Sequence, residues 1–354
     1  MLTFESLDGA VLVDKPAGPT SHDVVARVRR LLHERRVGHT GTLDPAATGV
    51  LPLVLGRATR LARFLSSGDK SYEAIVRLGF STDTGDGEGR PTGPRVATLP
   101  PREAVEAALE SFRGTFMQQP PAFSAKKIRG TRSHRLARAR RQQTGVRVDS
   151  DPDVRTGGEN AVAVSSLPPP VSVTAHAIEV LGTDRDTVRL RVECSAGFYV
   201  RSLAQDLGER LGVGAHLVAL RRTRSGSFTL ADAIELDNAE RRPDEARTRI
   251  IPLAGVLPEF APVVLTSDGV RKAIHGREIG RQDCLSGFGI RDSGFGIRDS
   301  GFDIRQSGVA SDHESRIPGP DSSLVRLLDP SGELVGIARP ASAAGLLHPS
   351  IVLV

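Results

Sequence analysis

Residues 35–63, RRVGHTGTLDPAATGVLPLVLGRATRLAR, hold the segment that decides the fold and the chemistry of this chain. Within them, residues 38–49 are mostly small and surround one imidazole, His39, and one carboxylate, Asp44. Small residues let the backbone of a ligand approach a loop closely. Because Asp44 precedes a proline, an ordinary turn residue is the alternative interpretation. With basic residues on both flanks, the loop suits an anionic polymer whose reacting group must reach the acid.

The composition is that of a soluble globular protein, with 354 residues, 39% hydrophobic and 25% charged, which is enough for two domains. No apolar run approaches the ~20 residues of a membrane span, and residues 1–10 lack the basic and apolar regions of a signal peptide. We therefore expect a cytoplasmic protein. The two cysteines are far apart and the histidines are scattered, so we expect neither a disulfide nor a metal site.

Positive charge is concentrated between Lys126 and Arg141, where KKIRGTRSHRLARARR has eight Lys or Arg residues and no acid. Such a run can be a solvated surface. It can also bind a phosphate backbone through charge-assisted contacts. Nucleic acid is the favoured partner.

Hydrophobic periodicity predicts an α+β fold with a mixed or largely antiparallel sheet. A buried strand is expected at 9–13, followed by a helix that opens with a capping box from Thr20 to Asp23. Further strands are expected at 72–78 and 188–192, where apolar and polar residues alternate. Further helices are expected at 59–65, 102–112 and 200–211.

The rest of the chain predicts an irregular insertion and a small C-terminal domain. Residues 142–170 are rich in Gly, Ser, Asp and Pro and read as a loop. Residues 286–306 repeat a seven-residue unit three times, but its glycines and its Phe-Ile spacing rule out a coiled coil. We expect residues 285–321 to be a mobile insertion without function. A turn at 329–332 between apolar runs predicts a hairpin in a small β-barrel.

The string GHTGTLDP at 38–45, continuing to GVL at 49–51, closely resembles the central motif of the TruB-type tRNA pseudouridine-55 synthases. Other segments match in the same order: KP at 15–16, GPTS at 18–21, KSYE at 70–73, LG at 78–79, TDTGD at 82–86, QPPAFSA at 119–125, GFYVR at 197–201, DLG at 206–208, GAH at 214–216 and LRR at 220–222. The resemblance implies the pseudouridine synthase fold over residues 1–256. A PUA-like RNA-binding barrel is implied for residues 257–354.

The resemblance also implies conversion of uridine-55 in the tRNA T-arm to pseudouridine by base flipping, without a cofactor. Asp44 is then the catalytic nucleophile, acting on ribose C1′ or through the 2′ proton. Arg201 is its charge partner, which keeps the carboxylate ionised in a desolvated pocket. Tyr72 stacks on the uracil and takes or relays its C5 proton.

Three more residues are implied to bind the substrate: Tyr199 and Leu220 line the uracil pocket, and His39 fills the space left by the extruded base. The chain has twelve Phe but only two Tyr, and both tyrosines, Tyr72 and Tyr199, fall inside the matched motifs. This distribution suggests that their hydroxyl groups are used. Half-buried strand tyrosines, a core leucine and a structural histidine are the alternatives.

Contacts with the RNA backbone are implied for seven basic residues, Lys15, Lys126, Lys127, Arg129, Arg132, Arg221 and Arg222. Four of them lie in an insertion at about 122–170, which in this family clamps RNA as a thumb. A thumb favours a stand-alone enzyme that works as a monomer without a guide RNA or obligatory protein partner. Ser133-His134 replaces the family's usual Leu-Tyr, so the closure of the thumb stays open.

Two other classes of function remain at the level of the sequence. A hydrolase of N-glycosidic bonds would pair Asp44 with Asp83 or Asp86. An RNA chaperone or binding module would not need Asp44, Tyr72 and Arg201 together, which argues against it.

Overall fold

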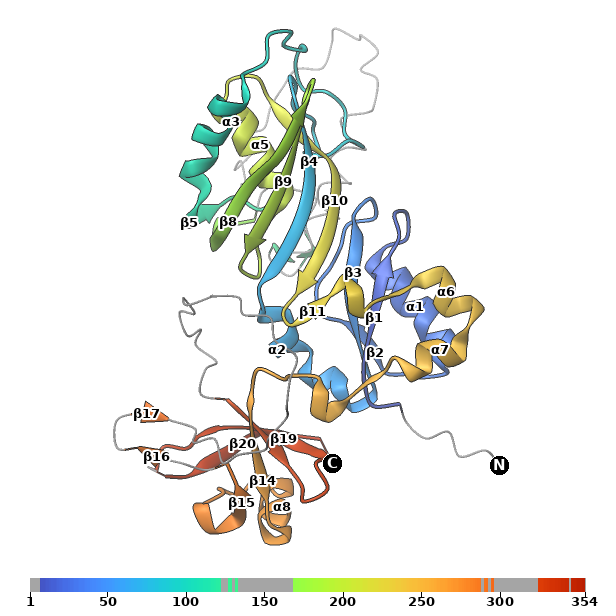
Figure 1. The fold of residues 1–354 in the computed structure, drawn as a ribbon, viewed down its shortest axis with the longest axis vertical. Helices are drawn as coiled ribbons and strands as arrows, with labels where there is room; N and C mark the ends of the chain where they lie inside the picture. Colours follow the sequence, from blue (N-terminus) through green and yellow to red (C-terminus); the bar gives the residue numbers. More distant parts are fainter. Residues whose placement is uncertain are drawn as a thin grey trace, which may run out of the picture.

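A computed structural model describes residues 7–121, 127–128, 131–132, 168–287, 290–291, 294–295, 324–343 and 345–353. Two sheets dominate it: a long central sheet, and a smaller sheet built by the C-terminal part of the chain (Figure 1).

The central sheet has eleven strands in the order β12-β1-β3-β10-β4-β9-β8-β5, with β2, β11 and β13 paired beside this path. Most neighbours are antiparallel, but β1 and β12, and β3 and β10, are parallel. The predicted mixed, largely antiparallel sheet is therefore confirmed. The strands are β1 (Gly9–Lys15), β2 (Val37–His39), β3 (Thr48–Leu55), β4 (Lys70–Leu78), β5 (Gly114–Gln118), β8 (Val171–Asp184), β9 (Thr187–Cys194), β10 (Ala215–Ser225), β11 (Phe228–Thr229), β12 (Ile234–Glu235) and β13 (Ile251–Pro252).

The alternation in the sequence places one face of each central strand in the core. In β9, Val188, Leu190 and Val192 are buried, while Arg189 and Arg191 between them are exposed. Because successive side chains of a strand point to opposite faces, this is the pattern of a sheet with one covered face. The strands expected at 9–13, 72–78 and 188–192 are confirmed as parts of β1, β4 and β9.

The predicted helices are confirmed, two of them with a 3₁₀ turn at one end. The capping box is present: the Asp23 amide donates to Thr20 Oγ1, and the Thr20 amide donates to the Asp23 carboxylate. The helices are α1 (Ser21–Leu32), α2 (Ala62–Ser67) after a 3₁₀ helix (Gly56–Leu61), α3 (Arg102–Leu109) before a 3₁₀ helix (Glu110–Phe112), α5 (Val200–Arg210), α6 (Leu236–Arg241), α7 (Pro243–Thr248) and α8 (Ser267–Ile274). Apolar residues of α1, α3, α5, α6 and α7 join the core on one face of the central sheet.

The C-terminal sheet has the order β15-β14-β18-β19-β20. The expected hairpin is confirmed, since Val325 pairs with Ala338 across the turn. The expected barrel is not confirmed, because the two edge strands β15 and β20 do not pair in the described residues and the sheet stays open. These strands are β14 (Ala261–Leu265), β15 (Cys284–Ser286), β18 (Val325–Leu328), β19 (Leu334–Pro340) and β20 (Leu347–Val352).

A second hydrophobic cluster joins the two sheets. Leu12 of β1 and Val50 of β3 lie on the face of the central sheet opposite the main helices. They belong to one buried cluster with Phe64 of α2 and with Leu334 and Ile337 of β19. The C-terminal sheet therefore packs against the strands that carry the Asp44 loop.

Two predicted segments lie largely outside the described residues. Most of the insertion at 122–170 is not described; the backbone of two short strands, β6 (Lys127–Ile128) and β7 (Thr131–Arg132), forms a hairpin within it. Most of residues 285–321 is not described either, apart from β15 and the short strands β16 (Ile290–Arg291) and β17 (Gly294–Phe295).

Candidate active site

The loop that carries Asp44 runs from β2 to β3 and is held by buried and partly buried hydrogen bonds. The Ser21 hydroxyl donates to the Leu43 carbonyl, and the Leu43 amide donates back to the same hydroxyl. The Lys15 ammonium donates to the carbonyls of Pro16, Pro45 and Ala47, at 2.9, 3.0 and 2.7 Å. Because anchors lie on both sides of Asp44, the backbone there is fixed before any substrate arrives.

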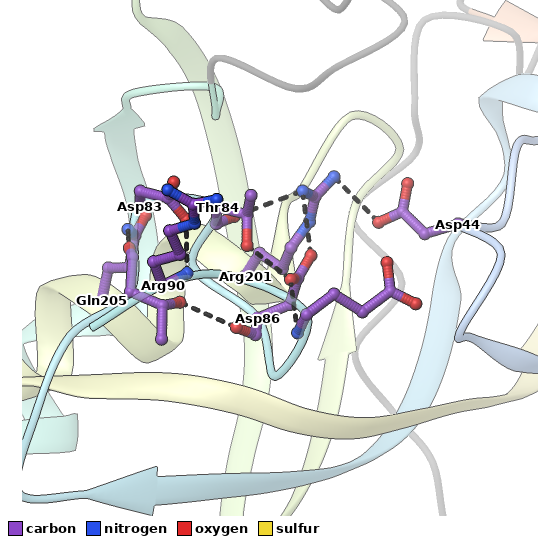
Figure 2. Close-up of polar contacts among 9 residues, drawn as sticks. Asp44, Asp83, Thr84, Asp86, Arg90, Arg201 and Gln205 are labelled. Carbon is purple, nitrogen blue, oxygen red and sulfur yellow. Dashed lines mark hydrogen bonds and ion pairs between the residues drawn. The ribbon is translucent and has the colours of Figure 1, made fainter. Parts of the chain in front are cut away.

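Asp44 forms an ion pair with Arg201 of α5, whose Nη2 lies 2.8 Å from Oδ2 (Figure 2). The Arg201 side chain is 8% exposed. Its Nη1 also lies 3.4 Å from Asp86 Oδ2 and donates to the Thr84 carbonyl. Asp86 is itself held, because Thr84 Oγ1 donates to its other oxygen. One guanidinium thus joins two carboxylates from separate parts of the chain.

The surroundings of Asp44 act on its pKa in opposite directions. Burial in the site raises the pKa above its ordinary value, because desolvation disfavours the charged form. The Arg201 charge lowers it, the Asp86 charge raises it, and a hydrogen bond from Arg201 and the Lys15 charge lower it further. The net direction is upward, so the carboxylate depends on its cationic neighbours to stay ionised.

A cavity of about 260 Å³ opens beside this ion pair. Five residues that the sequence assigned to catalysis or substrate binding line it together: Asp44, Tyr72, Tyr199, Arg201 and Leu220. They come from the β2–β3 loop, β4, the start of α5 and β10. Burial raises the pKa of the Tyr72 phenol, and the charge of Arg222 opposes part of that rise. A phenol in this setting stays protonated at neutral pH.

His39 lies at the end of β2 and does not itself line the cavity. Its Nδ1 accepts a hydrogen bond from the amide of Gly41, which does line the cavity. Its ring also packs edge-on against His22, with 5.2 Å between ring centroids. The imidazole therefore lies beside the start of the Asp44 loop, in contact with His22 of α1.

Two of the predicted phosphate contacts are wrong. Lys15 is 0% exposed and Arg222 is 1% exposed. The Lys15 ammonium holds the Asp44 loop, and Arg222 donates to the carbonyls of Val50 and Gly41. Both cations are used inside the protein, so neither presents its charge to an RNA backbone.

Arg221 remains available at the surface, with 42% of its side chain exposed, and it pairs with Asp14 at 2.6 Å. The other four predicted contacts are not assessed by the structure. Lys126 and Arg129 lie outside the described residues, and only the backbone of Lys127 and Arg132 is described.

The sequence reasoning missed Lys70, which is 6% exposed and lines the cavity. Its ammonium donates to the Ser66 carbonyl at the end of α2, and burial lowers its pKa to about 8. Alternation could have revealed it, because Lys70 and Tyr72 are two apart in one strand and so share a face. Lys15, Lys70, Arg201 and Arg222 are all buried, which makes the surroundings of the cavity strongly basic.

Within the described ranges, no group of three or more His, Cys, Asp or Glu residues could hold a metal ion. In the same ranges, no helix is long and apolar enough to cross a membrane. Asp83, one of the two acids considered as a partner for a hydrolase, does not line the cavity; its carboxylate accepts from the Arg90 amide.

Comparisons with known proteins agree with this geometry. Residues 29–150 match the family model described as TruB family pseudouridylate synthase (N terminal domain). Residues 201–253 match that of the tRNA pseudouridylate synthase B C-terminal domain. The second match lies in α5, β10 and the elements up to β13, so it belongs to the central sheet rather than to the C-terminal one.

Curated relatives cover most of the chain. A protein named tRNA pseudouridine synthase B from Solibacter usitatus is 43% identical over 274 residues, 77% of this chain and 86% of that protein. One of the same name from Thermobifida fusca is 45% identical over 281 residues, 77% of this chain and 86% of that protein. Another, from Cupriavidus metallidurans, is 39% identical over 346 residues, 97% of this chain and 94% of that protein.

Among solved structures, a chain in an H/ACA RNP bound to a substrate RNA containing 2′-deoxyuridine overlays with a TM-score of 0.63. It is 22% identical, and the match covers 98% of this chain and 86% of that chain. At that identity the likeness concerns the fold, and it confirms the predicted pseudouridine synthase fold. The identity of the curated relatives carries the stronger conclusion: this chain belongs to the TruB family of pseudouridylate synthases.

Proposed function

We propose that this chain is an isomerase that converts uridine-55 in the T-arm of tRNA to pseudouridine, with Asp44 as the nucleophile. The observation that carries the proposal is the Asp44–Arg201 ion pair in the wall of a cavity that Tyr72 also lines. Relatives named tRNA pseudouridine synthase B, at about 40% identity, support the choice of tRNA. Binding alone would not require a carboxylate kept ionised inside a pocket.

The chemistry needs only groups that the chain supplies. In attack at C1′, an oxygen of Asp44 forms a bond to C1′ while the N1–C1′ bond breaks and its electron pair stays with the uracil. The uracil turns, C5 bonds to C1′ and releases Asp44, and C5 loses a proton as N1 gains one. The product is an isomer of the substrate, so no cofactor is needed. Removal of the 2′ proton is the alternative role for the same carboxylate.

The cavity walls hold the extruded base. Taking a base out of a stacked loop costs about a few kcal/mol, which contacts in the pocket offset. Tyr72 stacks on the uracil and relays the C5 proton, while Tyr199 and Leu220 close the sides. His39, beside the Asp44 loop, occupies the space that the base leaves in the RNA.

The RNA backbone is bound by Arg221 and by the basic insertion at 122–170, through Lys126, Lys127, Arg129 and Arg132. In this proposal residues 1–256 form the catalytic domain, and residues 257–354 form a PUA-like domain that adds RNA contacts. The enzyme works as a monomer in the cytoplasm, without a guide RNA or obligatory protein partner. The insertion at 285–321 takes no part.

The deciding experiment maps pseudouridine in a tRNA transcript after incubation with the wild type or with Asp44→Asn. The wild type should modify position 55 alone, and a transcript with cytidine there should stay unmodified. The Asp44→Asn variant should lose turnover while its tRNA affinity stays within about tenfold, or ~1.4 kcal/mol. Release of free uracil would instead identify a hydrolase, and near-normal turnover by Asp44→Asn would refute the role of Asp44.

A further inference from the structure

Arg222 is a buried cation that the proposed chemistry has not yet used. It lies on β10, is 1% exposed, and lines the same cavity as Asp44 and Tyr72. In the described part of the chain no carboxylate pairs with it, whereas Arg201 pairs with Asp44 and Arg221 pairs with Asp14. A buried charge without a counter-ion is unfavourable unless other groups compensate for it. The burial of this charge therefore needs a structural or functional explanation.

The contacts of Arg222 connect three separate segments of the site. Its Nε donates to the Val50 carbonyl of β3 at 2.8 Å. Its Nη2 donates to the carbonyl of Gly41, three residues before Asp44, at 3.2 Å. On its other side, Arg222 lies directly opposite Tyr72 in the register of β10 and β4. Directly opposed residues have Cβ atoms only about 5 Å apart, and both the charge of Arg222 and a side-chain hydrogen bond with it act on the pKa of the Tyr72 phenol.

The backbone packing shows that this position is built for close contact. Gly49, at the end of the Asp44 loop, pairs with Arg222 across β3 and β10. A Cβ on Gly49 would lie 2.2 Å from the Arg222 carbonyl oxygen. The strand that carries Arg222 therefore touches the loop at both ends, by its side chain at Gly41 and by its backbone at Gly49.

We propose that Arg222 is a positioning residue of the active site: its guanidinium ties the Asp44 loop to Tyr72 and keeps a positive charge beside the phenol. The inference rests on the proposed function and adds a residue to it. Arg suits this task because its planar fork donates in several fixed directions and stays charged at any working pH. Lys70 does not replace it, because its ammonium donates to the Ser66 and Gly68 carbonyls rather than to the Asp44 loop.

The electrostatic consequence is specific to Tyr72. The charge of Arg222 and its hydrogen bond lower the pKa of the phenol, against the larger effect of burial. Removing the charge should raise the pKa of Tyr72 further and leave the hydroxyl less able to pass on a proton. A purely structural arginine would not have this effect on one phenol.

The composition of the chain allows a direct test. Tyr72 and Tyr199 are its only tyrosines, so 3-fluorotyrosine incorporated into a Tyr199→Phe chain labels Tyr72 alone. The ¹⁹F resonance of that label should move in Arg222→Gln. It should stay unchanged in Arg221→Gln, a matched control because Arg221 directly precedes Arg222, points to the opposite face of the strand and pairs with Asp14.

Kinetics of chains with Tyr199 intact give the second readout. Arg222→Gln should lower kcat by about 100-fold with a small change in KM, the size expected when one preorganised donor is lost. Arg222→Lys keeps a charge but not the fork, so it should recover about tenfold of that loss. If Arg222→Gln does not fold, Arg222→Lys decides by the same two readouts, with a tenfold fall in kcat and a displaced resonance expected.

The proposal requires both effects. A resonance that stays in place while kcat falls, or turnover within about twofold of wild type, would overturn it. Failure of the proposed function looks different, because the wild type would then form no pseudouridine at position 55 while the shift of the Tyr72 resonance in Arg222→Gln could still be measured.

Discussion

Arg201 joins Asp44 to Asp86: its Nη2 lies 2.8 Å from Asp44 Oδ2, and its Nη1 lies 3.4 Å from Asp86 Oδ2. The Asp44 side chain is 43% exposed, whereas that of Arg201 is 8% exposed. The arginine that fixes the carboxylate therefore leaves part of the Asp44 side chain accessible. The negative charge of Asp86 raises the pKa of Asp44 and so opposes the lowering by Arg201.

The first prediction concerns the fall of activity at low pH, the acid limb of the pH–rate profile. Asp44 must be ionised to react, and its pKa lies above the ordinary value. Activity should therefore fall as the pH drops through this raised pKa. Arg201→Gln removes the cation that favours ionisation, so the limb should move to higher pH, together with a fall in maximal rate. Single-turnover rates measured from acidic to neutral pH report this shift.

Asp86→Asn supplies a control of opposite sign. The charge of Asp86 raises the pKa of Asp44, so its removal should move the acid limb to lower pH. If both variants shift the limb in the same direction, the limb does not report Asp44.

The second prediction separates loop support from RNA contact at Lys15. In Lys15→Met, three carbonyls lose this donor; the Pro45 carbonyl keeps the Gly18 amide, but the Ala47 carbonyl loses a buried hydrogen bond, at about 1–3 kcal/mol. We expect a lower melting temperature and slower turnover, but no change in the salt dependence of tRNA binding. If the slope of log K against log salt concentration is smaller by about one in Lys15→Met than in the wild type, Lys15 does contact a phosphate.

The third prediction concerns the basic insertion. Replacing Arg135, Arg138, Arg140 and Arg141 by glutamine should weaken binding to every RNA and flatten its salt dependence by about three, if each contacts one phosphate. Filter binding or fluorescence anisotropy at several salt concentrations measures both. An unchanged slope would show that this segment does not grip the RNA backbone.

Much of the fold could be predicted because it follows from local patterns. The alternation in β4 and β9 and the capping box at Thr20 depend only on neighbours in the sequence. The open C-terminal sheet could not be predicted in the same way, because closure depends on whether distant edge strands meet. A hairpin pattern such as that of β18 and β19 occurs in open and closed sheets alike.

The site shows the same division between local and long-range information. Resemblance to a family, rather than any local pattern, predicted that Asp44, Tyr72 and Arg201 act together. The burial of Arg222 was missed because it depends on the register of β10 against β3 and β4. One local signal was present: Leu220 and Arg222 are two apart in a strand, so they share the pocket face, and Arg221 faces away.

The last prediction tests the contact between the Asp44 loop and β10. Gly49 and Gly18 have nearly the same backbone angle, φ +106° and +108°, which strains any other residue. A Cβ on Gly18 would meet nothing within 4 Å, whereas one on Gly49 would lie 2.2 Å from the Arg222 carbonyl oxygen. Gly18→Ala should therefore show the strain alone, about 1 kcal/mol, and Gly49→Ala should lose at least about 3 kcal/mol, because β3 must separate from β10. Chemical denaturation of both variants measures the difference, and equal losses would mean that the close approach of Gly49 to Arg222 does not contribute to stability.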